Sequence, residues 1–158
     1  MGSTYSLLER AERLERLASE IYLALASRYG GEIKALFERL AIEEAQHANR
    51  VRLLASRYRH DSRLVASVPG CTAELDALAA EAELVLRSVV EGAWDGDADA
   101  ALRRAAELEA RFSQAHASSL SRDAHPELLA FFEQLAAQDE AHRRLLERTE
   151  PAPRRQGG

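Results

Sequence analysis

The chain has 158 residues and a formal net charge of −5, a size that corresponds to a single domain. Hydrophobic residues make up 46% of it and charged residues 30%, which argues against a disordered chain. The acidic excess gives no support to nucleic-acid binding, and the single cysteine, Cys71, excludes an internal disulfide framework and a cysteine-based metal site within one chain. No apolar run is long enough for a transmembrane helix and no signal peptide is recognisable, so we expect a cytoplasmic protein that does not bind membranes.

Periodic apolar residues predict helices and no strands. The predicted helices cover 5–29, 32–58, about 72–92, 98–120 and 126–148. Gly30 and Gly31 separate the first two, which therefore form an antiparallel hairpin. A loop over 59–71 leads to the short third helix, and Asp97 or Asp99 caps the fourth.

Two segments of the chain repeat each other. LFERLAIEEAQH over 36–47 aligns without a gap with FFEQLAAQDEAH over 131–142, an offset of 95 residues. Two helical hairpins related by this repeat and joined by a crossover predict an all-α four-helix bundle. We expect the bundle to occupy 1–149, with the short extra helix in its crossover, and a disordered tail over 150–158.

Carboxylate and imidazole side chains interrupt the apolar stripes of three predicted helices. They are Glu44 and His47, Glu109 and His116, and Asp139 and His142. Burying an isolated ionised carboxylate is costly, so several such interruptions, each combining a carboxylate with an imidazole, indicate a shared cation. Residues three apart lie on one helix face, and this donor set suits iron or manganese, with zinc as a further alternative.

The EEAQH and QDEAH segments, each preceded by an aromatic-Glu-x-Leu-Ala sequence, resemble the second and fourth bundle helices of ferritin-like di-iron proteins, especially rubrerythrins. That family takes one glutamate from each of two helices and a Glu-x-x-His motif from each of the other two. The resemblance therefore implies two iron ions in a ferritin-like bundle. Carried over by position, it implies these ligands: Glu20, Glu44, His47, Glu109, Asp139 and His142.

Two of these ligand positions have alternatives. Glu20 lies at the edge of its apolar stripe, and Glu15 is the less favoured substitute on the same helix. Glu107 is the nearest substitute for Glu109. Periodicity therefore supports the two glutamates outside the Glu-x-x-His-like motifs less strongly than the motifs themselves.

Three further residues have roles that the sequence leaves open. Asp139 stands where the family usually has a glutamate, so its shorter side chain can bind one ion instead of bridging two. His116 is a candidate extra ligand, a partner that orients a carboxylate, or a core histidine with a satisfied hydrogen bond. Tyr22 is a candidate hydrogen-bond partner of a ligand.

The resemblance implies peroxide reduction or Fe(II) oxidation by O₂, in oxidative stress or iron handling. Rubrerythrins also carry a rubredoxin domain that needs four cysteines; because this chain has one, we expect a separate electron-donor protein. The resemblance also suggests a homodimer, with helices exchanged between chains as one arrangement. Two alternatives stay open: a ferritin-like di-iron oxygenase or hydroxylase, and a metal-free helical protein that binds a partner.

Overall fold

The computed structural model describes residues 4–60, 72–120 and 124–151. These ranges contain the helices α1 (Thr4–Ala26), α2 (Gly31–His60), α3 (Thr72–Val90), α4 (Ala98–Ser118) and α5 (Pro126–Arg148). No described residue lies in a strand, and the helix bounds agree with the predicted ones to within a few residues, so the all-α fold class is confirmed. Cys71 and most of the predicted tail lie outside the described residues.

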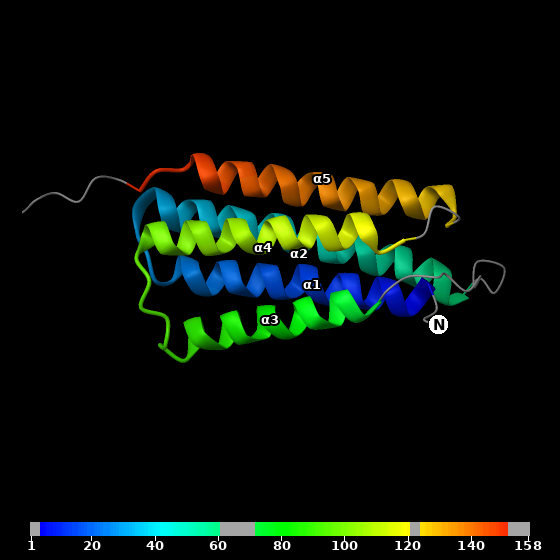
Figure 1. The fold of residues 1–158 in the computed structure, drawn as a ribbon, viewed down its shortest axis with the longest axis horizontal. Coiled ribbons are helices and arrows are strands. Elements are labelled where there is room, and N and C mark those ends of the chain that lie inside the picture. The colour runs from blue at the N-terminus through cyan, green and yellow to red at the C-terminus, as the bar shows by residue number, and fades with distance from the viewer. Residues whose placement is uncertain (1–3, 61–71, 121–123, 152–158) are drawn as a thin grey trace, which may run out of the picture.

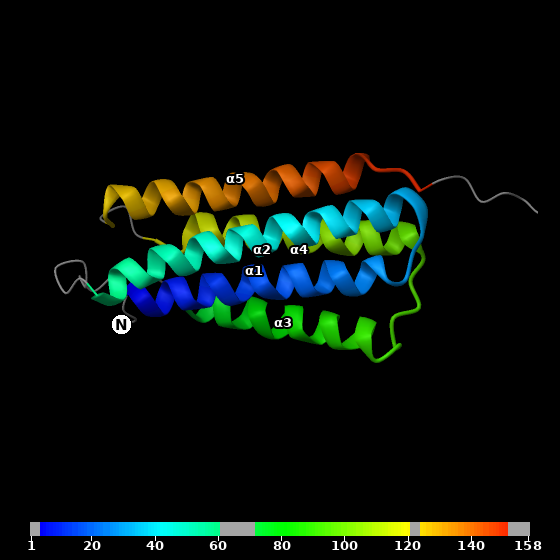
Figure 2. The ribbon, with the colours of Figure 1, turned by 180° about the vertical axis from the view of Figure 1, so that it is seen from behind.

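The helices lie side by side along one long axis, and each runs opposite to the one before it (Figure 1). α1 packs most extensively on α2, and α4 packs on α5, so the two predicted hairpins are present. α3 packs on α1 at the outside of the bundle (Figure 2). It carries the chain from the end of the bundle where α2 finishes back to the end where α4 begins. The crossover is therefore largely helical.

Local sequence signals end and begin these helices. Gly31, at the start of α2, has a φ of +57°, and Gly92, after α3, has a φ of +76°. Both values lie in the left-handed region, which glycine adopts without the strain that a Cβ would cause. Asp97 caps α4, because its carboxylate accepts a hydrogen bond of 2.9 Å from the backbone N–H of Ala100.

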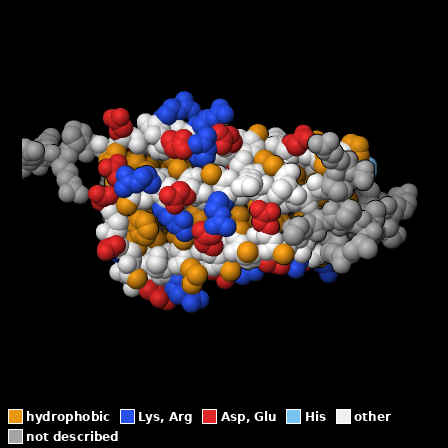
Figure 3. Space-filling view, viewed as in Figure 1, with side chains coloured by type: hydrophobic (Ala, Val, Ile, Leu, Met, Phe, Trp, Pro, Cys, Tyr) orange, Lys and Arg blue, Asp and Glu red, His pale blue; other side chains and the backbone are white. Residues whose placement is uncertain are grey.

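The core consists mainly of leucine and alanine from all five helices, with a few aromatic rings. On the outer surface acidic and basic side chains are mixed (Figure 3), and many form ion pairs, such as that of Arg143 with Glu147 at 2.5 Å. Exposed ion pairs contribute little to stability, so apolar burial is the main favourable term. None of the described helices combines the length and the apolar character needed to cross a membrane.

Candidate metal centre

Seven ionisable side chains meet inside the bundle, where apolar residues are the rule. They are Glu15 from α1, Glu44 and His47 from α2, Glu109 and His116 from α4, and Asp139 and His142 from α5. Each is at most 5% exposed to solvent. They occupy core-facing positions of otherwise apolar stripes, and we refer to these seven residues as the buried cluster.

One group of donors within the buried cluster comes from three helices. Glu15, Glu44, His47 and Asp139 each offer one ligand atom, and these four atoms lie within 4.8 Å of one another. Nδ1 of His47 is 3.2 Å from Glu15 Oε2 and 3.3 Å from Glu44 Oε2. Such separations are expected between atoms that bind the same ion at ~2 Å.

A second group shares Glu44 with the first. Glu44, Glu109 and His142 also offer ligand atoms within 4.8 Å of one another. Nδ1 of His142 is 2.5 Å from Glu44 Oε1 and 3.5 Å from Glu109 Oε1. One carboxylate oxygen of Glu44 thus faces His47 and the other faces His142, which is the arrangement of a carboxylate that bridges two ions.

The two histidines of the repeated motifs face each other across this arrangement. The rings of His47 and His142 are nearly parallel, at 7°, and their centroids are 5.5 Å apart. The repeat in the sequence is therefore reproduced in space as two neighbouring donor groups, each with its own imidazole.

The hydrogen-bonding state of the cluster tests whether its residues fit metal ions. Among the described residues, the buried side-chain atoms without a hydrogen-bond partner are Glu15 Oε2, Glu44 Oε1, His47 Nδ1, Tyr58 Oη, Glu109 Oε2, His116 Nε2, Asp139 Oδ1 and His142 Nδ1. All except the tyrosine oxygen belong to the buried cluster, where Glu15 Oε2 and His47 Nδ1, like Glu44 Oε1 and His142 Nδ1, are close to each other but are not aligned for a hydrogen bond. Unpaired buried polar atoms are costly, whereas cations satisfy such oxygen and nitrogen atoms directly. The donor set therefore fits metal ions.

The pKa values of the buried cluster are shifted, because its side chains are buried and their charges lie close together. Burial, reinforced by the charge of Glu44, raises the pKa of Glu15 to about 7. Burial also raises the pKa of Asp139 well above its usual range. Burial by itself would lower the pKa of both motif histidines, but the surrounding carboxylates raise it, to about 9 for His47 and about 11 for His142. Metal ions that bind these ligands must displace the protons.

His116 contacts two carboxylates of the first group. Its Nδ1 is 2.7 Å from Asp139 Oδ2, and its Nε2 is 3.3 Å from Glu15 Oε1. Burial lowers the pKa of the His116 imidazole, which favours the neutral ring. The contacts agree with a residue that orients Asp139, one of the three roles that the sequence left open. Asp139 belongs to the first donor group only, in keeping with its shorter side chain.

Two residues outside the cluster hold its ligands by hydrogen bonds. The hydroxyl of Tyr22 donates to Glu109 Oε1, so the structure brings Tyr22 to the position expected of a ligand's partner. Nε2 of His142 is 2.8 Å from Glu43 Oε2. Both contacts join different helices.

The structure corrects the glutamate assigned to the first helix. Glu20 is exposed and does not reach the cluster, whereas Glu15 is 2% exposed and lies within it. Five residues correspond to about 1.4 helical turns, so the two glutamates point in clearly different directions. On the fourth helix Glu109 is buried and Glu107 is exposed, so of these two it is Glu109 that the structure brings into the cluster.

A signal for Glu15 is present in the sequence. The offset of 95 residues that relates Glu44 to Asp139 and His47 to His142 relates Glu109 to position 14. That position is next to Glu15 and six residues from Glu20. Extending the repeat to the first helix of each hairpin would therefore have favoured Glu15.

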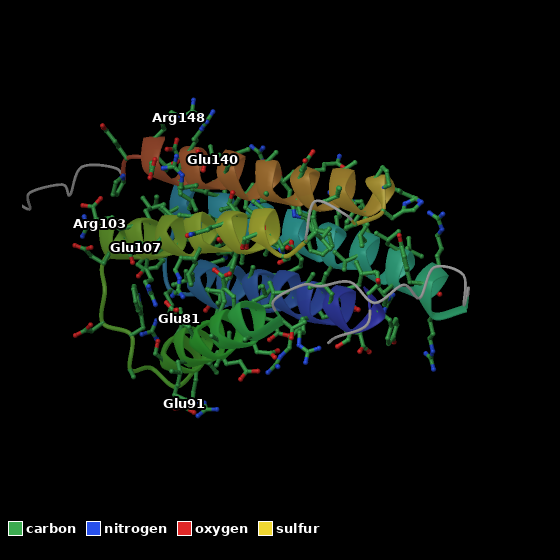
Figure 4. The ribbon with its side chains drawn as sticks, turned by 45° about the vertical axis from the view of Figure 1, so that its right-hand side comes forward. Glu81, Glu91, Arg103, Glu107, Glu140 and Arg148 are labelled. Atoms are coloured by element: carbon green, nitrogen blue, oxygen red, sulfur yellow. The ribbon has the colours of Figure 1, made fainter. Side chains whose placement is uncertain are left out.

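The cluster is separate from the surface groove between α4 and α5. This groove has a volume of about 490 Å³, and none of its lining residues belongs to the cluster. Arg103 and Glu107, labelled in Figure 4, are among its lining residues. The burial of the cluster thus favours chemistry on very small molecules over chemistry on a large substrate.

Comparison with known proteins agrees with this geometry. The rubrerythrin family model matches residues 6–122. The chain belongs to the rubrerythrin family. The match covers the helices that carry Glu15, Glu44 and Glu109, and α5 lies outside it. No match was found among the curated proteins or among the solved structures. Membership of the rubrerythrin family supports a ferritin-like di-iron protein and, in general terms, a redox enzyme.

Proposed function

We propose that this rubrerythrin-family protein binds two iron ions in the buried cluster and reduces hydrogen peroxide. The observation that carries the proposal is the position of Glu44, whose two carboxylate oxygens face the imidazoles of two separate donor groups. Two neighbouring Fe(II) ions, when bound, would supply the two electrons needed to convert one H₂O₂ and two protons into two molecules of water.

Different side chains of the buried cluster would bind each of the two ions. Glu15, His47 and Asp139 would hold the first ion, Glu109 and His142 would hold the second, and Glu44 would be shared. The four carboxylates offset the charge of two divalent cations, and the imidazoles restrict the geometry. Because the surrounding core is apolar and closely packed, it limits the access of water and favours a small oxidant.

Oxidation of Fe(II) by O₂ is the second candidate, and the asymmetry of the cluster favours it. The first donor group has four members, whereas the second has three. An ion with fewer protein ligands exchanges more readily, as an enzyme that turns over iron as a substrate requires. The two candidates share one site and differ in whether the second iron stays bound.

The proposal also covers the setting of the protein. We propose a cytoplasmic homodimer that receives electrons from a separate electron donor and acts against oxidative stress. The resemblance to rubrerythrins supports the dimer. Sedimentation equilibrium tests the dimer: a monomer at all concentrations would contradict it.

Metal analysis and rapid kinetics test the proposed activity. The protein is loaded anaerobically with Fe(II), its iron content is measured, and the reduced form is mixed with H₂O₂ or with O₂ in a stopped-flow instrument. We expect two irons per chain and a much faster reaction with H₂O₂; an equal or faster reaction with O₂ supports Fe(II) oxidation instead.

Matched variants connect that result to the cluster. Glu44→Ala should abolish binding of the iron pair, because it removes a ligand from both donor groups. Glu107→Ala, at an exposed position of α4, should bind iron as the unaltered protein does. Absence of stoichiometric metal, or full metal binding by Glu44→Ala, would overturn the proposal.

A further inference from the structure

A row of four aromatic rings connects Glu109 with the surface of the protein. Nε1 of Trp94 donates a hydrogen bond of 2.7 Å to the Tyr29 hydroxyl. The Tyr29 ring centroid is 6.4 Å from that of Phe37, which stacks on Tyr22 at 5.9 Å and 22°. Tyr22 completes the row, because its hydroxyl donates to Glu109 Oε1. We call these four residues the aromatic row.

The aromatic row runs from the interior to solvent. Tyr22 is 1% exposed and Phe37 is fully buried, whereas Tyr29 and Trp94 are half-buried. The outer two line a surface hollow of about 500 Å³, together with Ser27, Arg28, Asp95 and Gly96. The hollow lies at the end of the bundle where α1 joins α2 and α3 joins α4 (Figure 2). It has the size of a small-molecule site and is partly polar.

Core packing by itself explains why two of the rings are buried. It does not explain why the tryptophan and two tyrosines lie in one row with their polar atoms hydrogen-bonded. The chain has one tryptophan and four tyrosines, and the aromatic row contains the tryptophan and two of the tyrosines. Among aromatic side chains, tryptophan and tyrosine lose an electron most readily, and each of the three has its polar atom in a hydrogen bond. The ring of Phe37 is near both phenols, with centroid distances of 5.9 Å to Tyr22 and 6.4 Å to Tyr29.

We propose that the aromatic row conducts single electrons from a small, water-soluble one-electron reductant in the surface hollow to the metal centre. The direction of electron flow rests on the proposed function, which makes the centre the electron acceptor. The conducting property belongs to the rings and is testable without iron.

Electrons and protons are balanced in each electron transfer along the aromatic row. When Tyr22 gives one electron to the centre, its phenol proton moves along the hydrogen bond to Glu109. Tyr29 then gives one electron to Tyr22 through the ring of Phe37, and the proton returns to Tyr22. Tyr29 lines the hollow, where solvent takes and returns its own phenol proton. Trp94 reduces Tyr29, and the reductant, which loses one electron, restores Trp94.

Flash photolysis of the full-length chain, metal-free and loaded with redox-inert Zn²⁺, tests this conduction. A dissolved photo-oxidant removes one electron from Trp94, and transient absorption follows the tryptophan and tyrosine radicals. We expect the tryptophan radical to decay at a rate independent of protein concentration while a tyrosine radical appears. Electron paramagnetic resonance on samples with deuterated tyrosine and single Tyr→Phe changes then assigns the radical to Tyr29 and Tyr22.

Variants separate the aromatic row from general radical chemistry. Tyr29→Phe should slow the decay of the tryptophan radical at least tenfold, and Phe37→Leu should confine the radical to Tyr29. Tyr58→Phe is the matched control, because Tyr58 lies in the last turn of α2 at the opposite end of the bundle, and it should change nothing (Figure 1). Circular dichroism establishes that each variant is folded.

The possible outcomes point to different conclusions. Equal decay rates in the unaltered protein and in Tyr29→Phe, or a radical that forms only on Tyr5 or Tyr58, would overturn the proposal. Zn²⁺ cannot change its oxidation state, so radical transfer in the Zn²⁺-loaded protein is independent of iron chemistry. If radical transfer is intact but the iron-loaded protein does not react with H₂O₂, the proposed function is contradicted and the conduction along the aromatic row is still supported.

Discussion

Glu43 of α2 and His142 of α5 form a hydrogen bond that determines how the imidazole faces the candidate metal centre. Oε2 of Glu43 accepts from Nε2 of His142 at 2.8 Å, which leaves Nδ1 toward Glu44 and Glu109. Arg39, one turn earlier on α2, pairs with Glu43 at 2.8 Å. The two adjacent glutamates of EEAQH therefore have different positions: Glu44 lies inside the cluster, and Glu43 lies behind a histidine of the other hairpin.

Replacing Glu43 by alanine should weaken metal binding at the second donor group without removing a ligand. Loss of a carboxylate behind a metal-binding histidine typically costs 10–100-fold in affinity, because the ring loses its orientation and some basicity. Competition titration with a chromophoric chelator measures the effect on each ion. Glu38→Ala, at an exposed position of the same helix, serves as the control. Equal affinities of the two variants for both ions would show that the hydrogen bond has no such role.

The glutamate of α1 can be identified by a second pair of variants. Glu15→Gln should lower the affinity for the first ion at least tenfold, because it removes a charged donor from a group of four. Glu20→Gln should have no effect, because Glu20 is exposed. Elemental analysis after dialysis against a weak chelator reports the metal retained. Loss of metal from Glu20→Gln alone would restore the assignment made from the sequence.

The metal-free protein should become less stable as the pH rises above 7. The folded-state pKa values of His47 and His142, about 9 and about 11, exceed the ordinary value of 6.5. Their contribution to stability is therefore complete below pH 6.5 and is lost as the pH rises through the folded-state values. Glu15, raised to about 7, contributes in the same direction between pH 4.5 and 7. Urea unfolding with EDTA at pH 7 and pH 9 measures the difference.

Metal should change this pH dependence. Ions that displace protons from the ligands bind more tightly as the pH rises, so the stabilisation that Zn²⁺ adds should be larger at pH 9 than at pH 7. The same urea experiment with and without Zn²⁺ measures it. A metal-free protein that gains stability from pH 7 to pH 9 would contradict the assignment of protons to the two histidines.

Two leucines of α1 should differ sharply in their contribution to stability. Leu14 is fully buried next to Glu15, whereas Leu23 is 55% exposed. Leu14→Ala should lower the free energy of unfolding by about 2–5 kcal/mol, through lost apolar burial and a cavity. Leu23→Ala should change it by about 0.5 kcal/mol or less, as is usual at the surface. Chemical denaturation of the two variants measures both values, and similar losses would mean that α1 is rotated from the orientation described.

The Glu-x-x-His-like motifs were the part of the candidate site that sequence predicted best. Glu44 and His47, like Asp139 and His142, are three residues apart within strongly periodic stripes, so helical geometry alone places both members of each pair on the core side. All four are buried in the structure. On α1 Glu20 was implied by the resemblance to rubrerythrins, and periodicity supported it less strongly because Glu20 lies at the edge of its apolar stripe.

Relationships between helices lay beyond what periodicity could show. The contact of Glu43 with His142 joins residues 99 positions apart. The aromatic row joins α1, α2 and the two connections α1–α2 and α3–α4, and it reaches Glu109 on α4. Such contacts depend on how far each helix is rotated and shifted along its axis against its neighbours. A helical stripe defines a face about 100° wide, which leaves that rotation and shift undetermined.

The sequence by itself determined the all-α fold, the two hairpins and the inward direction of the repeated carboxylate–histidine pairs, because those features follow from a period of 3.6 residues and from local end signals. Only the tertiary structure decided that Glu15 completes the first donor group, that Glu44 faces both imidazoles, and that His116 contacts Asp139. The physical reason is that packing of leucine and alanine between helices sets their mutual register. That register decides which buried donors meet.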